Sequence, residues 1–100
     1  MDSLTSKQRA HLRGLAHGLK PVVHVGKEGV NEAVLAAIEE ALHTRELLKV
    51  RVLDAAPVDT ADAGRAVAEA MDDVQLVQVV GNVFVLYRPF SESPKIRLPA

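Results

Sequence analysis

Two glycines with a lysine between them form the stretch of this chain that is best suited to bind an anion. Gly26 and Gly29 enclose Lys27 and Glu28, after an apolar run and before Asn31, a residue typical of helix N-caps. Glycine brings backbone N–H groups close to a ligand, and the first turn of a helix has unpaired N–H donors that attract anions. Because no enzyme motif is present, we expect this anion to be a nucleic-acid backbone.

Glycines three residues apart are not a specific signal by themselves. At an average glycine content of about 7%, such a pair arises by chance about once in every two chains of this length. Glu28 is also a carboxylate, which would repel a phosphate unless it points away. From spacing alone, an ordinary turn between a strand and a helix is the commoner explanation, so the loop needs support from the rest of the chain.

Cationic side chains provide part of that support. A helical wheel places Arg9, Arg13 and Lys20 in one stripe, and an alternating strand points Lys49 and Arg51 to one side. Such a stripe is most often a solvated surface, but this one has no acidic partners. The net charge is only −1, yet its sign alternates along the chain: +4 over residues 1–27, −4 over 28–46, +2 over 47–53, −5 over 54–75 and +2 over 76–100. One face can therefore be basic while another is acidic, and the local field steers a ligand.

No arrangement typical of an enzyme is present. The four histidines are scattered without the spacing of metal ligands, cysteine is absent, and neither G-x-S-x-G nor G-x-x-x-x-G-K-[ST] occurs. A catalytic base would need a partner group, and the sequence shows none. We therefore expect no catalytic residue, no metal ligand and no cofactor.

The length and composition predict a single domain over residues 1–100. A chain of 100 residues can bury roughly 60 to 70% of its unfolded surface in one core. No apolar run reaches the about 18 residues of a membrane span, and the polar N-terminus does not resemble a signal peptide. Without cysteine, nothing indicates an oxidising compartment. We expect a cytoplasmic monomer that has no membrane partner.

Hydrophobic periodicity predicts three helices. The first begins near Ser6, where Thr5 and Gln8 have capping-box spacing, and Gly18 and Pro21 end it. The second is capped by Asn31 and ends near Thr44, and the third is capped by Asp59 or Thr60. We expect the acidic residues of the second helix on its solvent face: Glu32, Glu39, Glu40 and Glu46.

Four apolar runs predict strands at 21–25, 47–53, 74–80 and 83–88, with Gly81-Asn82 as a hairpin turn. The element order is α-β-α-β-α-β-β. Right-handed crossovers place the second and third helices on one face of a small mixed sheet, which is an α/β fold of the two-layer α+β sandwich type. Residues 90–100 form either a short edge strand or a basic tail.

Four blocks of this sequence occur in an order that is typical of a known domain family. They are residues 4–17 (LTSKQRAHLRGLAH), 19–23 (LKPVV), 25–29 (VGKEG), and VG at 80–81 with VLYRP at 85–89. The blocks resemble the CRM domain (chloroplast RNA splicing and ribosome maturation), in particular its stand-alone bacterial form, the YhbY-type proteins. The resemblance extends from Leu4 to about Leu98 and is far more specific than the glycine pair.

The resemblance implies an RNA-binding module with a fold like the C-terminal domain of translation initiation factor three. It implies that the G-x-x-G loop acts like that of KH domains, which clamps the nucleic-acid backbone. In this chain the loop is Gly26, Lys27, Glu28 and Gly29, and the implied basic surface includes the first helix and Arg88. Because bacterial members are associated with precursors of the large ribosomal subunit, the implied partners are ribosomal RNA and, further, ribosomal proteins.

Two functions of different classes follow. In the first, the glycine loop and a basic surface bind RNA by shape and backbone, because few aromatic residues are available for stacking on bases. The candidate contacts are Gly26, Lys27, Glu28, Gly29, Arg9, Arg13, Lys20, Lys49, Arg51 and Arg88. In the second, the chain is a protein-interaction adaptor that uses its acidic helices, and the glycine loop is only structural.

Overall fold

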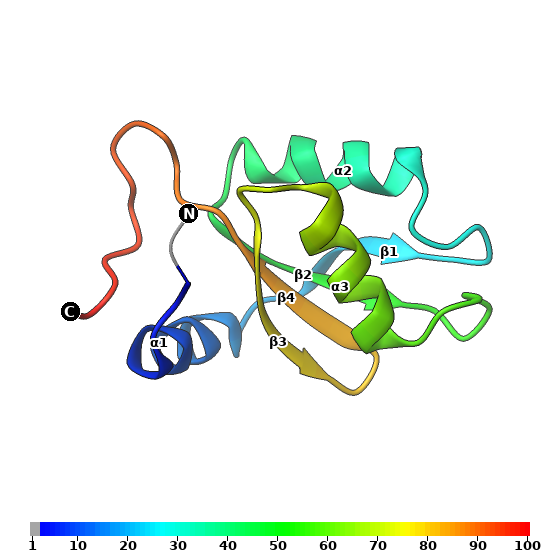
Figure 1. Cartoon of the computed structure of the whole chain (residues 1–100), viewed down its shortest axis with the longest axis horizontal. Coiled ribbons are helices and arrows are strands. Elements are labelled where there is room, and N and C mark those ends of the chain that lie inside the picture. Colours follow the sequence, from blue (N-terminus) through cyan, green and yellow to red (C-terminus); the bar gives the residue numbers. More distant parts are fainter. Residues whose placement is uncertain (1–2) are drawn as a thin grey trace.

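A four-stranded mixed sheet separates two helices on one face from a third helix on the other (Figure 1). The structure is a computed structural model that describes residues 3–100. Its elements follow the predicted order: α1 (Ser6–Ala16), β1 (Pro21–Val25), α2 (Glu32–Leu42), β2 (Leu47–Val52), α3 (Thr60–Ala70), β3 (Gln75–Val80) and β4 (Val83–Tyr87). The predicted α/β class is therefore confirmed, and α1 covers the face that α2 and α3 leave open.

Each helix begins at the predicted cap. The Thr5 hydroxyl accepts a hydrogen bond from the Gln8 N–H, and the Gln8 side chain accepts one from the Thr5 N–H. Asn31 Oδ1 accepts from the Val34 N–H at 3.0 Å, and the Asp59 carboxylate accepts from the Asp62 N–H at 2.8 Å. These side chains satisfy donors that have no partner within the helix.

The strands lie in the order β1-β2-β4-β3. The strand β1 runs parallel to β2, and β4 is antiparallel to both β2 and β3. The hairpin through Gly81 and Asn82 therefore folds β4 back into the space between β2 and β3. The crossover through α3 passes over this inserted strand.

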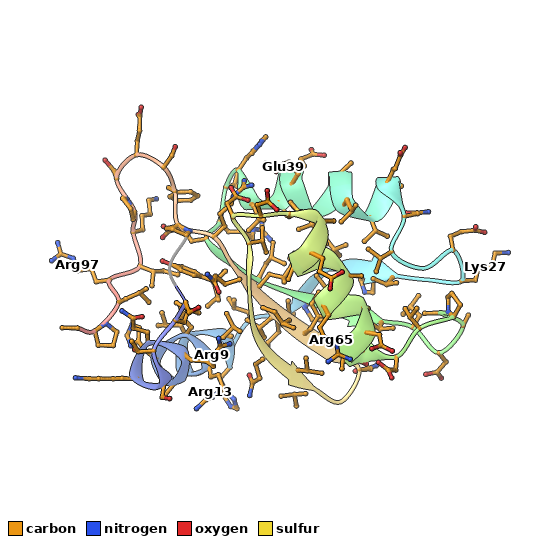
Figure 2. All side chains as sticks on the ribbon, viewed as in Figure 1. Arg9, Arg13, Lys27, Glu39, Arg65 and Arg97 are labelled. Carbon is orange, nitrogen blue, oxygen red and sulfur yellow. The ribbon has the colours of Figure 1, made fainter. Side chains whose placement is uncertain are left out.

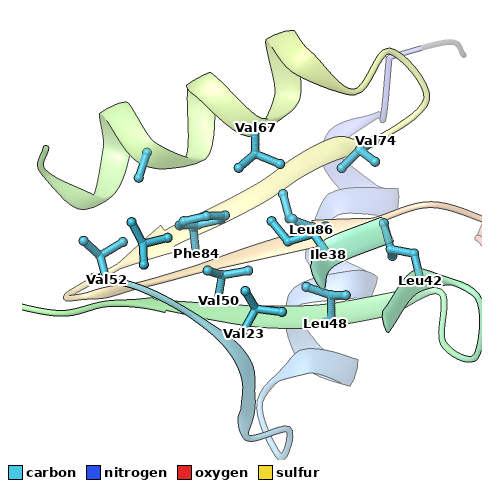
Figure 3. Close-up of a cluster of buried hydrophobic side chains, with 12 residues drawn as sticks. Val23, Ile38, Leu42, Leu48, Val50, Val52, Val67, Val74, Phe84 and Leu86 are labelled. Carbon is cyan, nitrogen blue, oxygen red and sulfur yellow. The ribbon is translucent and has the colours of Figure 1, made fainter. Parts of the chain in front are cut away.

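The larger core fills the space between the sheet and the helices α2 and α3 (Figure 3). Ile38 of α2, Val67 of α3 and Phe84 of β4 are fully buried there. A Cβ atom on Gly64 would lie 2.9 Å from Leu76 Cδ1 and 3.3 Å from Phe84 Cγ, so a larger residue would force the Leu76 side chain to shift. Ala63 and Gly64 on the buried side of α3 thus allow this helix to lie close to the sheet.

A smaller core lies under α1 on the opposite face. Leu12 and Ala16 of α1 pack there on Leu47, Val77, Val85 and Tyr87, with Leu4, Ile96 and Leu98 at the edge. The chain after β4 forms no strand within the described residues, so the edge-strand alternative for residues 90–100 is not realised. The segment instead returns along the end of the molecule to α1 (Figure 1).

Glu46 holds this C-terminal segment in place through hydrogen bonds. The prediction that Glu46 lies on the solvent face of α2 is wrong, because the residue follows α2 in the chain and is only 4% exposed. Its carboxylate accepts hydrogen bonds from the backbone N–H groups of Phe90 at 2.8 Å, Lys95 at 2.9 Å and Ile96 at 2.7 Å. Three such donors replace the water that burial removes.

None of the helices described for residues 3–100 has both the length and the apolar character needed to cross a membrane.

Candidate nucleic-acid interface

A groove between α1 and the uncovered part of the sheet brings four of the predicted cations together. Its volume is about 830 Å³, and its charged lining is Arg13 of α1, Lys20 before β1, and Lys49 and Arg51 of β2. Among the described residues that line it, none is acidic. Because none of these described lining residues carries the opposite charge, the potentials of the four cations add up in the groove.

The alternation of β2 explains how two of these cations reach the groove. Leu48, Val50 and Val52 point into the larger core, so Lys49 and Arg51 project from the opposite face of the sheet. Lys49 Nζ donates to the backbone carbonyl of His17 at 3.5 Å, at the C-terminal end of α1. This contact ties the strand to the helix at one side of the groove.

Arg9 has a different place from its neighbours in the predicted stripe. Its Nη1 atom donates to the carbonyls of Leu76 at 2.7 Å and Val77 at 2.9 Å. The pairing of β3 with β4 shifts register between Leu76 and Gln78. As a result, Val77 packs under α1 while Gln78, the next residue, also faces this side and lines the groove. Arg9 thus holds the carbonyls of an irregular strand that shapes the groove.

Arg88 is also engaged by other side chains. Its guanidinium donates to both carboxylate oxygens of Glu39 at 2.8 Å and lies 3.5 Å from a carboxylate oxygen of Asp73. The hydrogen bonds to Glu39 raise the pKa of Arg88, and the same bonds lower the pKa of the Glu39 carboxyl. The Arg88 side chain is 15% exposed. The structure therefore places it outside the groove, with its charge compensated.

The glycine loop is a hydrogen-bonded turn at the tip of β1. The Gly29 N–H donates to the Gly26 carbonyl at 3.0 Å, and the Asn31 N–H donates to the Gly29 carbonyl at 3.1 Å. These bonds and the Asn31 cap use several of the donors that we expected to be available for an anion. Lys27 and Glu28 form the exposed tip of the turn, and Lys27 extends from the end of the molecule (Figure 2).

The field at this loop is weaker than in the groove. A Cβ atom on Gly29 would lie 3.4 Å from Pro57 Cγ, so the 53–59 segment packs directly against the loop. That segment carries Asp54 and Asp59, and Glu28 lies in the turn itself. Three carboxylates therefore lie in the loop or in the segment packed against it, whereas none of the described residues that line the groove is acidic.

The groove and the loop are connected along one face of the sheet. His24 is the register partner of Arg51, and it lies two residues before Gly26 on the exposed side of β1. A ligand that follows β1 from the groove would therefore reach the glycine loop.

Known proteins are similar in sequence to nearly the whole chain. The family model for the CRS1 / YhbY (CRM) domain matches residues 4–88. The chain belongs to this family. The relative named "Probable RNA-binding protein YqeI" of Bacillus subtilis is 45% identical over 96 residues, which are 96% of this chain and 99% of the relative. An RNA-binding protein of Haemophilus influenzae is 46% identical over 99% of this chain and 98% of its own length.

A solved structure has the same fold. The solution structure of the protein SAV1595 from Staphylococcus aureus matches with a TM-score of 0.81 at 40% identity, over 97% of this CRM domain and all of that chain. The predicted resemblance to the stand-alone bacterial CRM proteins is thus confirmed.

Sequence reasoning found the four cations of the groove in this CRM domain but missed its uncharged lining, including two residues of β3. Gln78 and Val80 of β3 line the groove opposite the cations. A regular alternation along β3 does not place Val77 and Gln78 on one face, and the register shift that does so has no signal in the sequence.

Within residues 3–100, no three acidic or histidine side chains are grouped to hold a metal ion.

Proposed function

We propose that this CRM domain binds RNA through the basic groove, with the glycine loop as a second contact. The observation that carries the proposal is the concentration of Arg13, Lys20, Lys49 and Arg51 in one groove, in a chain of net charge −1; no carboxylate of residues 3–100 lines this groove. The names of the relatives support RNA as the polyanion.

The groove supplies most of the electrostatic attraction. Arginine can donate two parallel hydrogen bonds to one phosphate, and lysine adds a mobile point charge. Each neutralised phosphate also releases condensed counterions, which makes affinity fall with added salt. Arg9 and Arg88 act indirectly in this proposal, because their guanidinium groups already bind the β3 carbonyls and Glu39.

The glycine loop contributes a clamp on the backbone. Lys27 and Glu28 are exposed at the tip of the turn, and Gly26 has no side chain to hold a sugar-phosphate chain away from the backbone N–H groups there. The fixed turn between Gly26 and Gly29 keeps these donors in place before RNA arrives. KH domains use a G-x-x-G loop in this way.

Charge reversal in the groove tests the proposal. In fluorescence anisotropy over a range of salt, we expect Arg13→Glu/Arg51→Glu to lower affinity for single-stranded RNA at least about tenfold and to flatten the salt slope by roughly 1.4. Lys27→Ala should flatten the slope by roughly 0.7. The matched control is Arg65→Glu/Arg97→Glu, which has the same charge change at exposed cations that do not line the groove. An equal loss in the control would overturn the groove as the binding site.

We further propose that the RNA belongs to a precursor of the large ribosomal subunit and that the chain acts in its assembly. The family membership supports this proposal, because bacterial CRM proteins are associated with such precursors. Co-sedimentation with ribosomal particles from cell extract tests it. We expect the protein to move with large-subunit precursors and to leave them when salt is raised.

A second function is favoured by the acidic surface of α2 and α3. Glu32 and Glu40 of α2 and Glu69 of α3 are exposed on the face opposite the groove. An adaptor that holds a ribosomal protein through these carboxylates would remain bound after nuclease treatment, whereas an RNA-bound protein would be released. The same sedimentation experiment therefore separates the two functions.

A further inference from the structure

The floor of the basic groove is apolar. Leu19, Pro21, Val80, Val83 and Val85 line it together with the four cations. Val80 is 57% exposed and Leu19 is 39% exposed, although both are large apolar side chains. A surface that binds only phosphates gains nothing from an exposed valine and an exposed leucine. Apolar surface surrounded by polar groups instead marks the place where a ligand buries an apolar part of its own.

Gln78 adds a polar group to this floor. Its Cα is paired with that of Val85 across the hairpin, as Val80 is paired with Val83, so the four residues form one patch on the face turned toward α1. Within residues 3–100, the Gln78 side-chain amide has no hydrogen-bond partner. An amide offers both donors and an acceptor, which suits the edge of a nucleobase.

We propose that the groove receives an unpaired nucleobase of single-stranded RNA. The base lies with one face on the valine floor and its edge at Gln78, while the adjoining phosphates bind Arg13, Lys49 and Arg51. This inference rests on the proposed function and names the form of RNA that the groove selects.

The chemistry of the floor favours a single strand over a duplex. The bases of an A-form duplex are stacked inside, so a duplex presents phosphates and 2′-hydroxyl groups that would leave the valines uncovered. A single strand can turn a base outward, and every base has an apolar face to bury. Arg13 and Arg51 can also stack their planar guanidinium groups on that base, and the imidazole of His17 is the aromatic ring among the described residues that line the groove.

The strand β3 provides a matched pair of variants. Val80→Ser removes apolar surface from the floor without changing charge. Val79→Ser makes the same change one residue earlier, at a side chain that is 38% exposed and does not line the groove, because Val79 is paired with the buried Phe84 on the other face. Both sites are exposed, so we expect both variants to fold, and thermal unfolding checks this.

Binding is measured by fluorescence anisotropy with three probes of equal length, about ten nucleotides: single-stranded RNA, the same strand with its bases removed, and an RNA duplex. We expect the wild type to prefer the intact single strand. Val80→Ser should weaken this binding about three- to tenfold while leaving the base-free strand unaffected. Val79→Ser should bind like the wild type. A second variant, Gln78→Ala, should also weaken binding to the intact strand only.

The outcomes separate the two proposals. Equal affinity of the wild type for the intact and the base-free strand, or equal effects of Val80→Ser and Val79→Ser, would overturn the base site and leave RNA binding intact. A preference for the duplex would do the same. Failure to bind all three probes at low salt, with binding of an acidic apolar peptide instead, would overturn both.

Discussion

Gly26 and Gly29 are three residues apart, but the structure requires glycine only at the second position. Gly29 has a φ of 71° and is buried against Pro57, where a Cβ atom would be in contact at 3.4 Å. Gly26 has no positive φ, and a Cβ atom there would meet nothing within 4 Å. The backbone geometry therefore requires glycine at position 29. At position 26 the fold would accept a side chain, and its absence leaves the backbone accessible from solvent.

Substitution of Gly26 tests whether this open approach serves the ligand. We expect Gly26→Ala to leave the free energy of unfolding within about 0.5 kcal/mol of the wild type, since it adds neither strain nor a clash. It should weaken RNA binding several-fold, because a methyl group would hold the sugar-phosphate chain away from the turn. Denaturant unfolding and anisotropy measure the two effects.

Gly29→Ala is the comparison for this prediction. A left-handed residue with a side chain costs about 1–2 kcal/mol, so this variant should lose stability. If Gly26→Ala binds RNA as well as the wild type, the loop is an ordinary turn between a strand and a helix.

Side-chain alternation predicts some of the candidate site and misses the rest. Lys49 and Arg51 are found from the sequence because a regular strand must turn every second residue to one side. Gln78 is missed because a register shift in β3 breaks that rule. Arg88 is a different case: its charge is visible in the sequence, but the two carboxylates that engage it come from other elements.

At the scale of elements, local signals were sufficient for the helices. The three caps and the strand limits follow from residues within one turn or one strand of the boundary. The C-terminal segment was not predictable in this way. Its position depends on Glu46, which binds backbone N–H groups more than 40 positions away in the chain, and no local pattern reports such a contact.

The ion pair between Glu39 and Arg88 joins α2 to the end of β4 and makes stability depend on pH. The Glu39 pKa is lower in the folded protein, chiefly because Arg88 donates hydrogen bonds to the carboxylate. A lowered folded-state pKa means that the stabilisation is present above the unfolded value of about 4.3 and is lost as pH falls through the folded value.

Replacement of this carboxyl should remove that dependence. Glu39 is 45% exposed, so solvent screens the pair and we expect Glu39→Gln to cost only about 1 kcal/mol at pH 7. The difference from the wild type should disappear as pH falls through the lowered folded-state pKa of Glu39, below which the wild-type carboxyl is also neutral. Urea unfolding over this pH range measures it. If the stability difference between the wild type and Glu39→Gln stayed constant with pH, it would come from packing and not from the charge of the carboxylate.

At the scale of the whole molecule, the charges separate by face. In the part of the chain that the structure describes, the groove between α1 and the sheet is lined by four cations and no carboxylate, while α2 and α3 carry exposed acidic residues on the opposite side. The sequence predicts the alternation of charge along the chain and allows one face to be basic while another is acidic, but it does not predict which face is which. Separation depends on the face that α1 covers and on the insertion of β4 between β2 and β3, which are both set by long-range packing.

The thickness of the molecule determines whether the acidic face opposes RNA binding. The molecule is 23 Å across in its thinnest direction, whereas the Debye length is about 8 Å at 0.15 M salt and about 30 Å at 0.01 M. Charges on the far face should therefore be screened from the groove at physiological salt and felt at low salt.

Neutralising that face tests this argument. The combined variant Glu32→Gln/Glu40→Gln/Glu69→Gln changes the net charge from −1 to +2, since each substitution removes one negative charge. We expect its affinity for single-stranded RNA to stay within about twofold of the wild type at 0.15 M salt and to exceed it several-fold at 0.01 M. The control is Glu28→Gln, beside Lys27, which should tighten binding at both salt concentrations because that carboxylate lies next to the proposed contact. If the far-face variant strengthened RNA binding as much at 0.15 M salt as at 0.01 M, RNA would also reach α2 and α3. The groove would then be only part of the binding surface.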